Sequence, residues 1–309
     1  MIPAHTTGYF TSLEDISRLI GNTPVFDFSR LSPNPEVAIL AKVEWLQFGG
    51  SVKSRPAYNI VREAVIAGKL TPGKAILDAS SGNTAISYAA IGAYAGIKVV
   101  VVLPENVSKM RINILKSMGA EIVFTSPFGG TDEAQHEAYR MFKNKPEMYF
   151  YADQYNNPDN WKVHYECTGW EVWQQSKGRI THFITGLGTT GSFTGISKKL
   201  KELKSGVRCI ALQPDSAMHI MEGWKHLETA KVPGIFDPFI ADEQRIVTSE
   251  EAIKMLLYVA KHEGLLLSPS AAANIAGAVE LASQLDKGVI VTLLPDNGDK
   301  YSELLNEIL

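Results

Sequence analysis

The chain has 309 residues and a formal net charge of −3, with 45% hydrophobic and 20% charged residues. This length supports one large domain or two ordinary ones, and so small a charge gives no indication of a nucleic-acid surface. Apolar runs stay shorter than the ~18 residues of a membrane span, and we expect no signal peptide. Cys167 and Cys209 form no CxxC pair, so we expect a reduced, cytoplasmic protein in which both are core residues, with no metal site.

Short β-branched runs alternate with longer segments whose apolar residues recur at helical spacing. Strands are predicted at residues 37–44, 74–80, 98–103, 121–125, 181–186, 207–213 and 288–294. Helices are predicted between them, among others at 55–68, 108–120 and 249–264. Nearly all-apolar strands that alternate with helices are typical of α/β layers with mostly parallel sheets. The polar, proline-containing stretch 154–162 predicts a boundary between two α/β units.

Ligands of open parallel sheets bind at loops where strands lead into helices, and the first such loop is QFGGSVKS at residues 47–54. We expect Ser51 or Ser54 to cap the helix that follows, which places Lys53 beside the helix N-terminus. The partial positive charge there, together with partial burial, lowers the pKa of a lysine amine and favours Schiff-base chemistry. A solvated lysine in a flexible loop remains the simpler interpretation of this stretch alone.

The second loop joins a predicted strand to an alanine-rich helix and consists of Ser80, Ser81, Gly82, Asn83 and Thr84. Backbone N–H groups at a helix start, with hydroxyls beside them, form a carboxylate or phosphate site. A serine N-cap followed by a glycine turn accounts for the same letters.

The third loop, GLGTTG at residues 186–191, matches G-x-G-x-x-G between a strand and a helix. Asp215 follows the next strand, where a ribose-binding acid stands in dinucleotide enzymes. The hydroxyls of Thr189, Thr190 and Ser192 suit a terminal phosphate better than a bridging pyrophosphate. Two interpretations remain: an NAD-dependent dehydrogenase, or an enzyme with a small phosphorylated cofactor.

Together these loops resemble those of the cysteine synthase family of fold type II pyridoxal-phosphate enzymes. The matching motifs occur in the family's order and are GNTP (21–24), GGSVKSRPA (49–57), SSGNT (80–84), QYNNPDN (154–160), GTTGS (188–192), EGLLLSPSAAAN (263–274) and PDNGDKY (295–301). The matches span nearly the whole chain, which makes the resemblance specific.

The resemblance implies two interleaved three-layer α/β domains with mostly parallel sheets, as in the tryptophan synthase β subunit. Residues 46–156 would form a smaller, mobile substrate-binding domain. Residues 1–45 and 157–309 would form a larger domain that carries the cofactor's phosphate loop. The family also implies pyridoxal 5′-phosphate as cofactor and a homodimer as the assembly, and some relatives bind serine acetyltransferase.

The resemblance assigns a role to each motif. Lys53 would bind the cofactor and act as general base, Asn83 would hold the cofactor ring, and Ser270 would face its pyridine nitrogen. The cofactor phosphate would bind Gly188, Thr189, Thr190, Gly191 and Ser192. The substrate carboxylate would bind Ser80, Ser81, Gly82, Thr84 and Gln154. A serine opposite the ring nitrogen suits β-elimination and replacement.

The implied reaction replaces the β-substituent of O-acetyl-L-serine or O-phospho-L-serine with sulfide to give L-cysteine. Residues 214–233 are more similar to the branch that takes O-phosphoserine, and Lys225 stands near the phosphate-binding arginine of that branch. A lysine would meet the phosphate as a point charge, although a solvated Lys225–His226 pair is the alternative. A cystathionine β-synthase that uses homocysteine is the closest rival, and the dehydrogenase is the rival of another class.

Two departures from the family pattern lead to local expectations. Thr190 stands where the family has a phosphate-loop glycine, so we expect its backbone to avoid positive φ. Pro269 precedes Ser270 and is expected to stiffen that loop.

Overall fold

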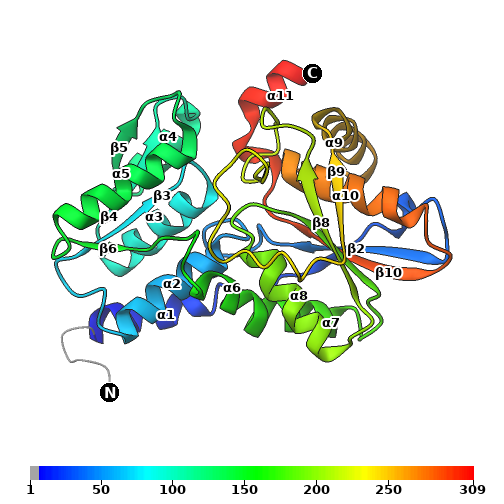
Figure 1. Ribbon diagram of the computed structural model, residues 1–309, viewed down its shortest axis with the longest axis horizontal. Coiled ribbons are helices and arrows are strands. Elements are labelled where there is room, and N and C mark those ends of the chain that lie inside the picture. Colours follow the sequence, from blue (N-terminus) through cyan, green and yellow to red (C-terminus); the bar gives the residue numbers. More distant parts are fainter. Residues whose placement is uncertain (1–6) are drawn as a thin grey trace. The chain divides into compact units, whose positions relative to one another are not determined.

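A computed structural model describes residues 7–309, which divide into two compact units (Figure 1). Within this part of the chain, unit 1 comprises residues 7–21 and 47–160, and unit 2 comprises residues 22–46 and 161–309. The chain is mixed α/β with mostly parallel sheets, as the sequence predicted.

Unit 1 is built around a parallel four-stranded sheet in the order β5-β4-β3-β6. Its strands are β3 (Ala75–Ala79), β4 (Val99–Pro104), β5 (Glu121–Thr125) and β6 (Tyr149–Tyr151). Its helices are α1 (Thr7–Ser17), α2 (Ser54–Ile66), α3 (Asn83–Ala95), α4 (Lys109–Ser117) and α5 (Gly130–Asn144). The helix α6 (Asp159–Val163) begins in unit 1 and ends in unit 2.

The strands of unit 1 are buried on both faces, because alternate side chains enter different clusters. Ile76 of β3 packs with α1, α2, α3 and α4, whereas Leu77 packs with Ala134 and Ala138 of α5. The unit therefore has three layers, and its strands read as continuous apolar runs for this reason.

Unit 2 is built around a six-stranded sheet in the order β1-β2-β10-β7-β8-β9, in which only β1 runs antiparallel to its neighbour. Its strands are β1 (Val25–Asp27), β2 (Val37–Val43), β7 (His182–Gly186), β8 (Arg208–Pro214), β9 (Glu243–Val247) and β10 (Gly288–Leu294). Its helices are α7 (Gly169–Gln175), α8 (Gly191–Leu203), α9 (Ser249–Glu263), α10 (Pro269–Ala282) and α11 (Ser302–Ile308). Short turns of helix are η2 (Ser29–Leu31), η3 (His164–Thr168) and η4 (Gly298–Lys300).

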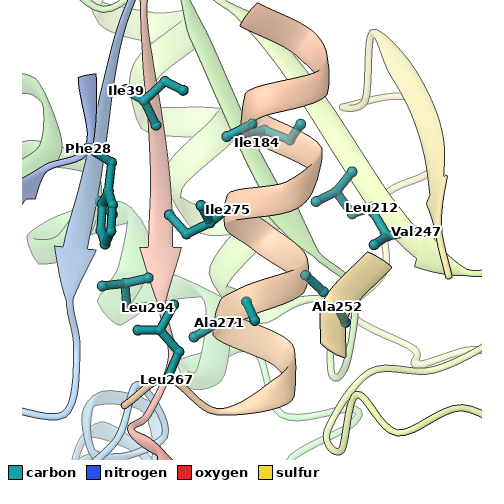
Figure 2. Packing of buried hydrophobic residues seen from close by; sticks show 14 of the residues in the cluster. Phe28, Ile39, Ile184, Leu212, Val247, Ala252, Leu267, Ala271, Ile275 and Leu294 are labelled. Atoms are coloured by element: carbon teal, nitrogen blue, oxygen red, sulfur yellow. The ribbon is translucent and has the colours of Figure 1, made fainter. Parts of the chain in front are cut away.

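The helix α10 lies on one face of this sheet and supplies the centre of the largest core (Figure 2). Ala271 and Ile275 of α10 pack with Ile39, Ile184 and Leu212 from three strands. On the sheet's other face, Phe183 of β7 stacks with Phe193 of α8 at a ring-centroid distance of 6.2 Å. The alanines of α10 let the helix approach the sheet closely, which fixes the helix that carries Ser270.

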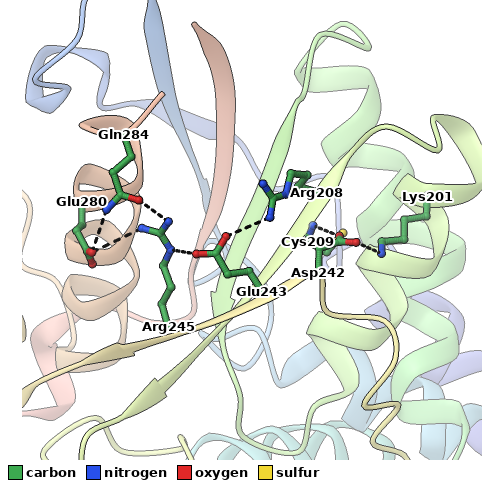
Figure 3. Close-up of polar contacts among 8 residues, drawn as sticks. All are labelled: Lys201, Arg208, Cys209, Asp242, Glu243, Arg245, Glu280 and Gln284. Carbon is green, nitrogen blue, oxygen red and sulfur yellow. Dashed lines mark hydrogen bonds and ion pairs between the residues drawn. The ribbon is translucent and has the colours of Figure 1, made fainter. Parts of the chain in front are cut away.

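A chain of charged side chains joins β9 to its neighbours in unit 2 (Figure 3). The Arg245 guanidinium donates to Glu243 at 2.6 Å and to Gln284 beside α10 at 2.6 Å. Asp242 accepts the Cys209 N–H at 2.7 Å and pairs with Lys201 of α8 at 2.8 Å. These contacts hold an edge strand whose own apolar pattern is weak.

The division into units differs in detail from the expected domains. The expected larger domain included residues 1–45, of which residues 1–6 lie outside the described part of the chain. The helix α1 packs in unit 1 instead, because Leu13 and Ile16 are buried against α2 and α3. The remaining crossings fall at residues 46/47 and 160/161, close to the expected boundaries.

All the predicted strands are present, with ends that differ by one residue at most. The sequence prediction missed β1, β6 and β9, which are short or lie at sheet edges and therefore lack a long apolar run. Cys209 is buried as expected, whereas Cys167 is exposed and the prediction that it is a core residue was wrong. No helix within residues 7–309 is long and apolar enough to cross a membrane.

Candidate active site

The turn that precedes α2 depends on two glycines. Gly49 and Gly50 have φ values of +87° and +66°, which residues with a side chain rarely adopt. A Cβ on Gly49 would lie 2.7 Å from Ser54 Oγ and 3.2 Å from Ser87 Oγ of α3. The turn is therefore packed tightly against both helices, and this packing fixes the backbone that carries Lys53.

The residue at the N-cap position of α2 is Lys53 itself, not Ser51 or Ser54. The expected serine cap was wrong, because Ser51 Oγ accepts the Lys53 N–H at 3.2 Å and Ser54 lies inside the first turn. The hydroxyl of Ser54 is buried and has no hydrogen-bond partner within the described residues. Lys53 is only partly buried and stands directly at the positive end of the helix dipole.

The 80–84 loop connects β3 to α3 and is held by its first serine. Ser80 Oγ accepts the N–H groups of Gly82 at 3.3 Å and Ala85 at 3.2 Å. Ser81, Gly82 and Asn83 remain partly exposed at the N-terminus of a 13-residue helix. An anion in reach of these residues would meet backbone N–H groups and the helix dipole together.

Gln154 is fastened to the same loop by its side chain. Thr84 Oγ1 donates to Gln154 Oε1 at 2.7 Å, and Gln154 Nε2 donates to the Ala79 carbonyl at 2.9 Å. Asn160 Nδ2 donates to the Gln154 carbonyl at 2.7 Å. Gln154 and the 80–84 loop, to which the resemblance gave a shared role, thus lie together in the structure.

Asp78 supports both of these elements, and the sequence analysis did not single it out. Its carboxylate accepts the N–H groups of Ala79 at 2.9 Å and Gln154 at 3.3 Å. Burial raises the pKa of Asp78 to about 8, and the two N–H groups oppose that shift. The sequence feature that could have revealed Asp78 is an acidic residue in the otherwise apolar strand AILDA.

The glycine-rich loop of unit 2 runs from the end of β7 to the start of α8. Thr189 and Thr190 are buried, and Thr190 has a φ of +70°. The expectation that this threonine avoids positive φ was wrong. The Thr194 N–H donates to the Thr190 carbonyl at 2.8 Å, so the first turn of α8 holds Thr190 in a conformation that costs a non-glycine residue roughly 1–3 kcal/mol. Such strain is found mostly at functional sites.

The residues of this loop fit a phosphate group. A Cβ on Gly188 would lie 2.0 Å from the Gly223 carbonyl oxygen, so only glycine permits the close approach. The hydroxyls of Thr190 and Thr194 are buried without a hydrogen-bond partner within the described residues. Two uncommitted hydroxyls at the N-terminus of a 13-residue helix offer donors to phosphate oxygens.

Ser270 is buried in the first turn of α10, where Ser268 caps the helix by accepting the Ala271 N–H at 3.2 Å. The oxygens of Ser268 and Ser270 lie 3.2 Å apart. Pro269 occupies the first turn, so it begins the helix and does not merely stiffen a loop. Ser270 therefore has a fixed backbone and a neighbouring hydroxyl as its partner.

Asn274 is a second residue that the sequence analysis missed. It is fully buried one turn after Ser270, and its Oδ1 accepts the Gly186 N–H at 2.8 Å. Its Nδ2 donates to the Leu293 carbonyl at 2.8 Å and to Thr185 Oγ1 at 3.2 Å. Asn274 thus ties α10 to β7, immediately before the phosphate-fitting loop. A lone asparagine in an alanine-rich helix was the available signal.

Lys225 lies in the long segment between β8 and β9 and is next to the same loop. Its N–H donates to the Leu187 carbonyl at 2.7 Å, and its amine donates to the Lys231 carbonyl at 3.3 Å. His226 contacts Thr229 at 2.9 Å, while burial lowers the pKa of His219. The structure places Lys225 at the loop, with its amine engaged inside its own segment.

Comparisons with known proteins identify the family. The model of the family "Pyridoxal-phosphate dependent enzyme" matches residues 16–296. A cysteine synthase of Aquifex aeolicus is 41% identical over 96% of this chain and 93% of its own. A solved cysteine synthase of Entamoeba histolytica has a TM-score of 0.88 and 31% identity, covering 95% of this chain and 89% of that chain. A solved O-acetylserine-dependent cystathionine β-synthase of Helicobacter pylori has a TM-score of 0.87 and 29% identity over 93% and 96%.

The chain therefore belongs to the family of pyridoxal-phosphate-dependent enzymes, and within it to the cysteine synthase family that the motifs had indicated. Pyridoxal phosphate is its cofactor, and its substrates are small molecules. The NAD interpretation of residues 186–191 is set aside on this ground. Within residues 7–309 no group of histidine, cysteine, aspartate or glutamate side chains could hold a metal ion.

Proposed function

We propose that the protein is a cysteine synthase, which replaces the β-substituent of an activated L-serine with sulfide. The observation that carries the proposal is the match to a named cysteine synthase over 96% of the chain. The ordered residues 49–57, 80–84, 154–160 and 188–192 support it, since each supplies a group that this chemistry needs. Bound pyridoxal phosphate supplies an electron sink for charge that develops at the substrate Cα.

We assign the cofactor to residues of the motifs that resemble those of the family. Lys53 would attach it covalently, Asn83 would hold its ring, and Ser270 would offer a hydroxyl to its ring nitrogen. The cofactor phosphate would bind residues 188–192 at the start of α8. The unpartnered hydroxyls of Thr190 and Thr194 support this assignment, because buried donors without partners are costly unless a ligand engages them.

Lys53 is the proposed proton carrier. Its amine would remove the proton from the substrate Cα and later return it. Lys53 directly precedes the first turn of α2 and is only partly buried. No other described residue of the 47–54 turn carries a group with this chemistry.

The substrate carboxylate is assigned to Ser80, Ser81, Gly82 and Thr84, with Gln154 beside them. The hydrogen bonds between Gln154 and Thr84 and between Gln154 and Ala79 support this assignment, because they fix the loop before the substrate arrives. We further propose that residues 46–156 act as the mobile substrate-binding domain. A homodimer is the assembly we infer from the family, some of whose members bind serine acetyltransferase.

The leaving group and the nucleophile are the open choices within the reaction. We propose that O-phospho-L-serine is accepted at least as well as O-acetyl-L-serine, since Lys225 stands at the phosphate-fitting loop and offers a positive charge. A cystathionine synthesis from homocysteine is the second candidate. The similarity to the Helicobacter pylori enzyme favours considering it.

The test is a product assay on the cofactor-loaded protein. Each activated serine is offered with sulfide or with homocysteine, and cysteine and cystathionine are quantified separately. We expect cysteine as the main product, and Lys225→Ala to raise the KM for O-phosphoserine more than for O-acetylserine. Cystathionine as the main product would support the rival function instead. If Lys225→Ala changed the KM values for O-phosphoserine and O-acetylserine by the same factor, Lys225 would have no role in binding the substrate phosphate.

A further inference from the structure

Unit 1 contains a cavity that no role assigned above uses, although Asn156, Asn157 and Pro158 of the QYNNPDN motif belong to its lining. Its volume is about 490 Å³, and it adjoins β6, the edge strand of the four-stranded sheet (Figure 1). Its lining includes Phe142, Tyr149, Tyr151, Lys69, Lys74 and Asp153. A volume of this size is within the range of pockets that bind small molecules.

One wall of the cavity is aromatic. The rings of Phe142 and Tyr151 are stacked at a centroid distance of 5.8 Å with an interplanar angle of 26°. Tyr149 stands two residues before Tyr151, on the same face of β6. All three rings are only partly buried, so their outer surfaces can contact a flat apolar group.

The rim of the cavity is cationic. Lys69 follows α2 and Lys74 precedes β3, and neither amine has a hydrogen bond or ion pair with any residue from 7 to 309. The carboxylate in the lining, Asp153, already accepts from Asn156 Nδ2 at 2.8 Å. The lining therefore carries two lysines and one engaged carboxylate, and the lysine amines are free N–H donors.

We propose that this cavity binds a small organic anion with an aromatic body. The aromatic part would lie on Phe142 and Tyr151, and the anionic group would meet Lys69 and Lys74. Either part alone would bind weakly, since exposed lysines hold inorganic anions poorly and one aromatic wall buries little surface. The combination selects molecules that carry both features.

The probe for the experiment is 1-anilinonaphthalene-8-sulfonate, which carries both features and fluoresces when its rings leave water. It is titrated into the cofactor-loaded wild-type protein, the Lys69→Met/Lys74→Met double variant and a Lys98→Met control. Lys98 is an exposed lysine of the same unit that does not line the cavity. Methionine keeps an apolar side chain of similar length, so the double variant removes charge and little packing.

We expect the dissociation constant of the probe to rise at least tenfold in the double variant and to stay unchanged in Lys98→Met. Equal affinity in all three proteins would overturn the proposal, as would an equal loss in the control. A second measurement localises the probe: it should slow the acetylation of Lys69 and Lys74, read by mass spectrometry, and leave Lys98 unaffected. A retained visible cofactor band shows that the double variant is folded, and neither readout depends on cysteine formation.

Discussion

At the scale of single residues, Asp78 is the clearest link between stability and the candidate site. Burial raises its pKa from 3.8 to about 8; the charge of Asp153 adds to the rise, and Tyr88 opposes it. The folded protein therefore keeps this carboxyl protonated over a pH range in which the unfolded chain ionises it. The contribution of Asp78 to the free energy of unfolding is fully present below about pH 4 and is lost as the pH rises through about 8.

We predict that Asp78→Asn flattens the pH dependence of unfolding between about pH 4 and 8. In the wild type, this one group lowers the free energy of unfolding by at most about 1.4 kcal/mol per pH unit over that window. Denaturant melts at several pH values measure the slope. The exposed Asp286 provides the control variant Asp286→Asn, and an unchanged slope in Asp78→Asn would remove Asp78 as its source.

Gly188 gives a second prediction at the residue scale. In Gly188→Ala the new methyl group would meet the Gly223 carbonyl at 2.0 Å, so the segment that carries Lys225 must shift. We predict at least tenfold weaker binding of pyridoxal phosphate, measured by equilibrium dialysis. Gly206→Ala, whose methyl group would meet nothing within 4 Å, should bind the cofactor like the wild type, and a matching loss there would contradict the steric explanation.

At the scale of elements, Asn274 connects α10 to β7 and β10. In Asn274→Leu the buried Gly186 N–H and Leu293 carbonyl would each lose a partner. Leaving two such groups unsatisfied costs about 2–6 kcal/mol in total, so we predict a markedly lower Tm. Asn274→Asp retains the acceptor for Gly186, and it should be less destabilising than the leucine at a pH where the carboxyl is protonated. A Tm equal to the wild type in Asn274→Leu would show that α10 is held by packing alone.

The elements also show where sequence reasoning succeeds and where it fails. The strands β3, β4, β7 and β10 were predictable because burial on both faces favours mostly apolar runs. The edge strand β6 has only three residues and no such run. The loops at 80–84 and 188–192 were predicted as anion sites from their small polar residues, since few residue types tolerate a close anion.

The parts of the site that could not be predicted depend on long-range contacts. Asp78 and Gln154 are 76 positions apart, and Asn274 meets Gly186 across 88 positions. The positive φ of Thr190 contradicts its residue type and is imposed by the loop and helix around it. No local pattern in the sequence reports such contacts, so only the folded structure reveals these supporting residues.

At the scale of the whole molecule, we expect bound pyridoxal phosphate to stabilise the folded protein. A ligand that binds only the folded protein stabilises it by about 4 kcal/mol at a thousandfold excess over its Kd. We predict that removing pyridoxal phosphate lowers hydrogen-exchange protection in residues 80–84 of unit 1 and in residues 186–192 of unit 2. A change in only one of the two loops would contradict the assignment of both loops to the cofactor.

The visible spectrum of the protein, recorded with Lys53 intact and replaced, decides whether Lys53 holds the cofactor. We predict a visible absorption band from covalently bound cofactor in the wild type, which shifts when O-acetylserine or O-phosphoserine is added. In Lys53→Ala the band of the lysine-bound cofactor should be absent, although cofactor held by the phosphate loop can still be retained. A wild-type protein that stays colourless with added pyridoxal phosphate, or a Lys53→Ala variant with an unchanged band, would contradict covalent attachment of the cofactor to Lys53.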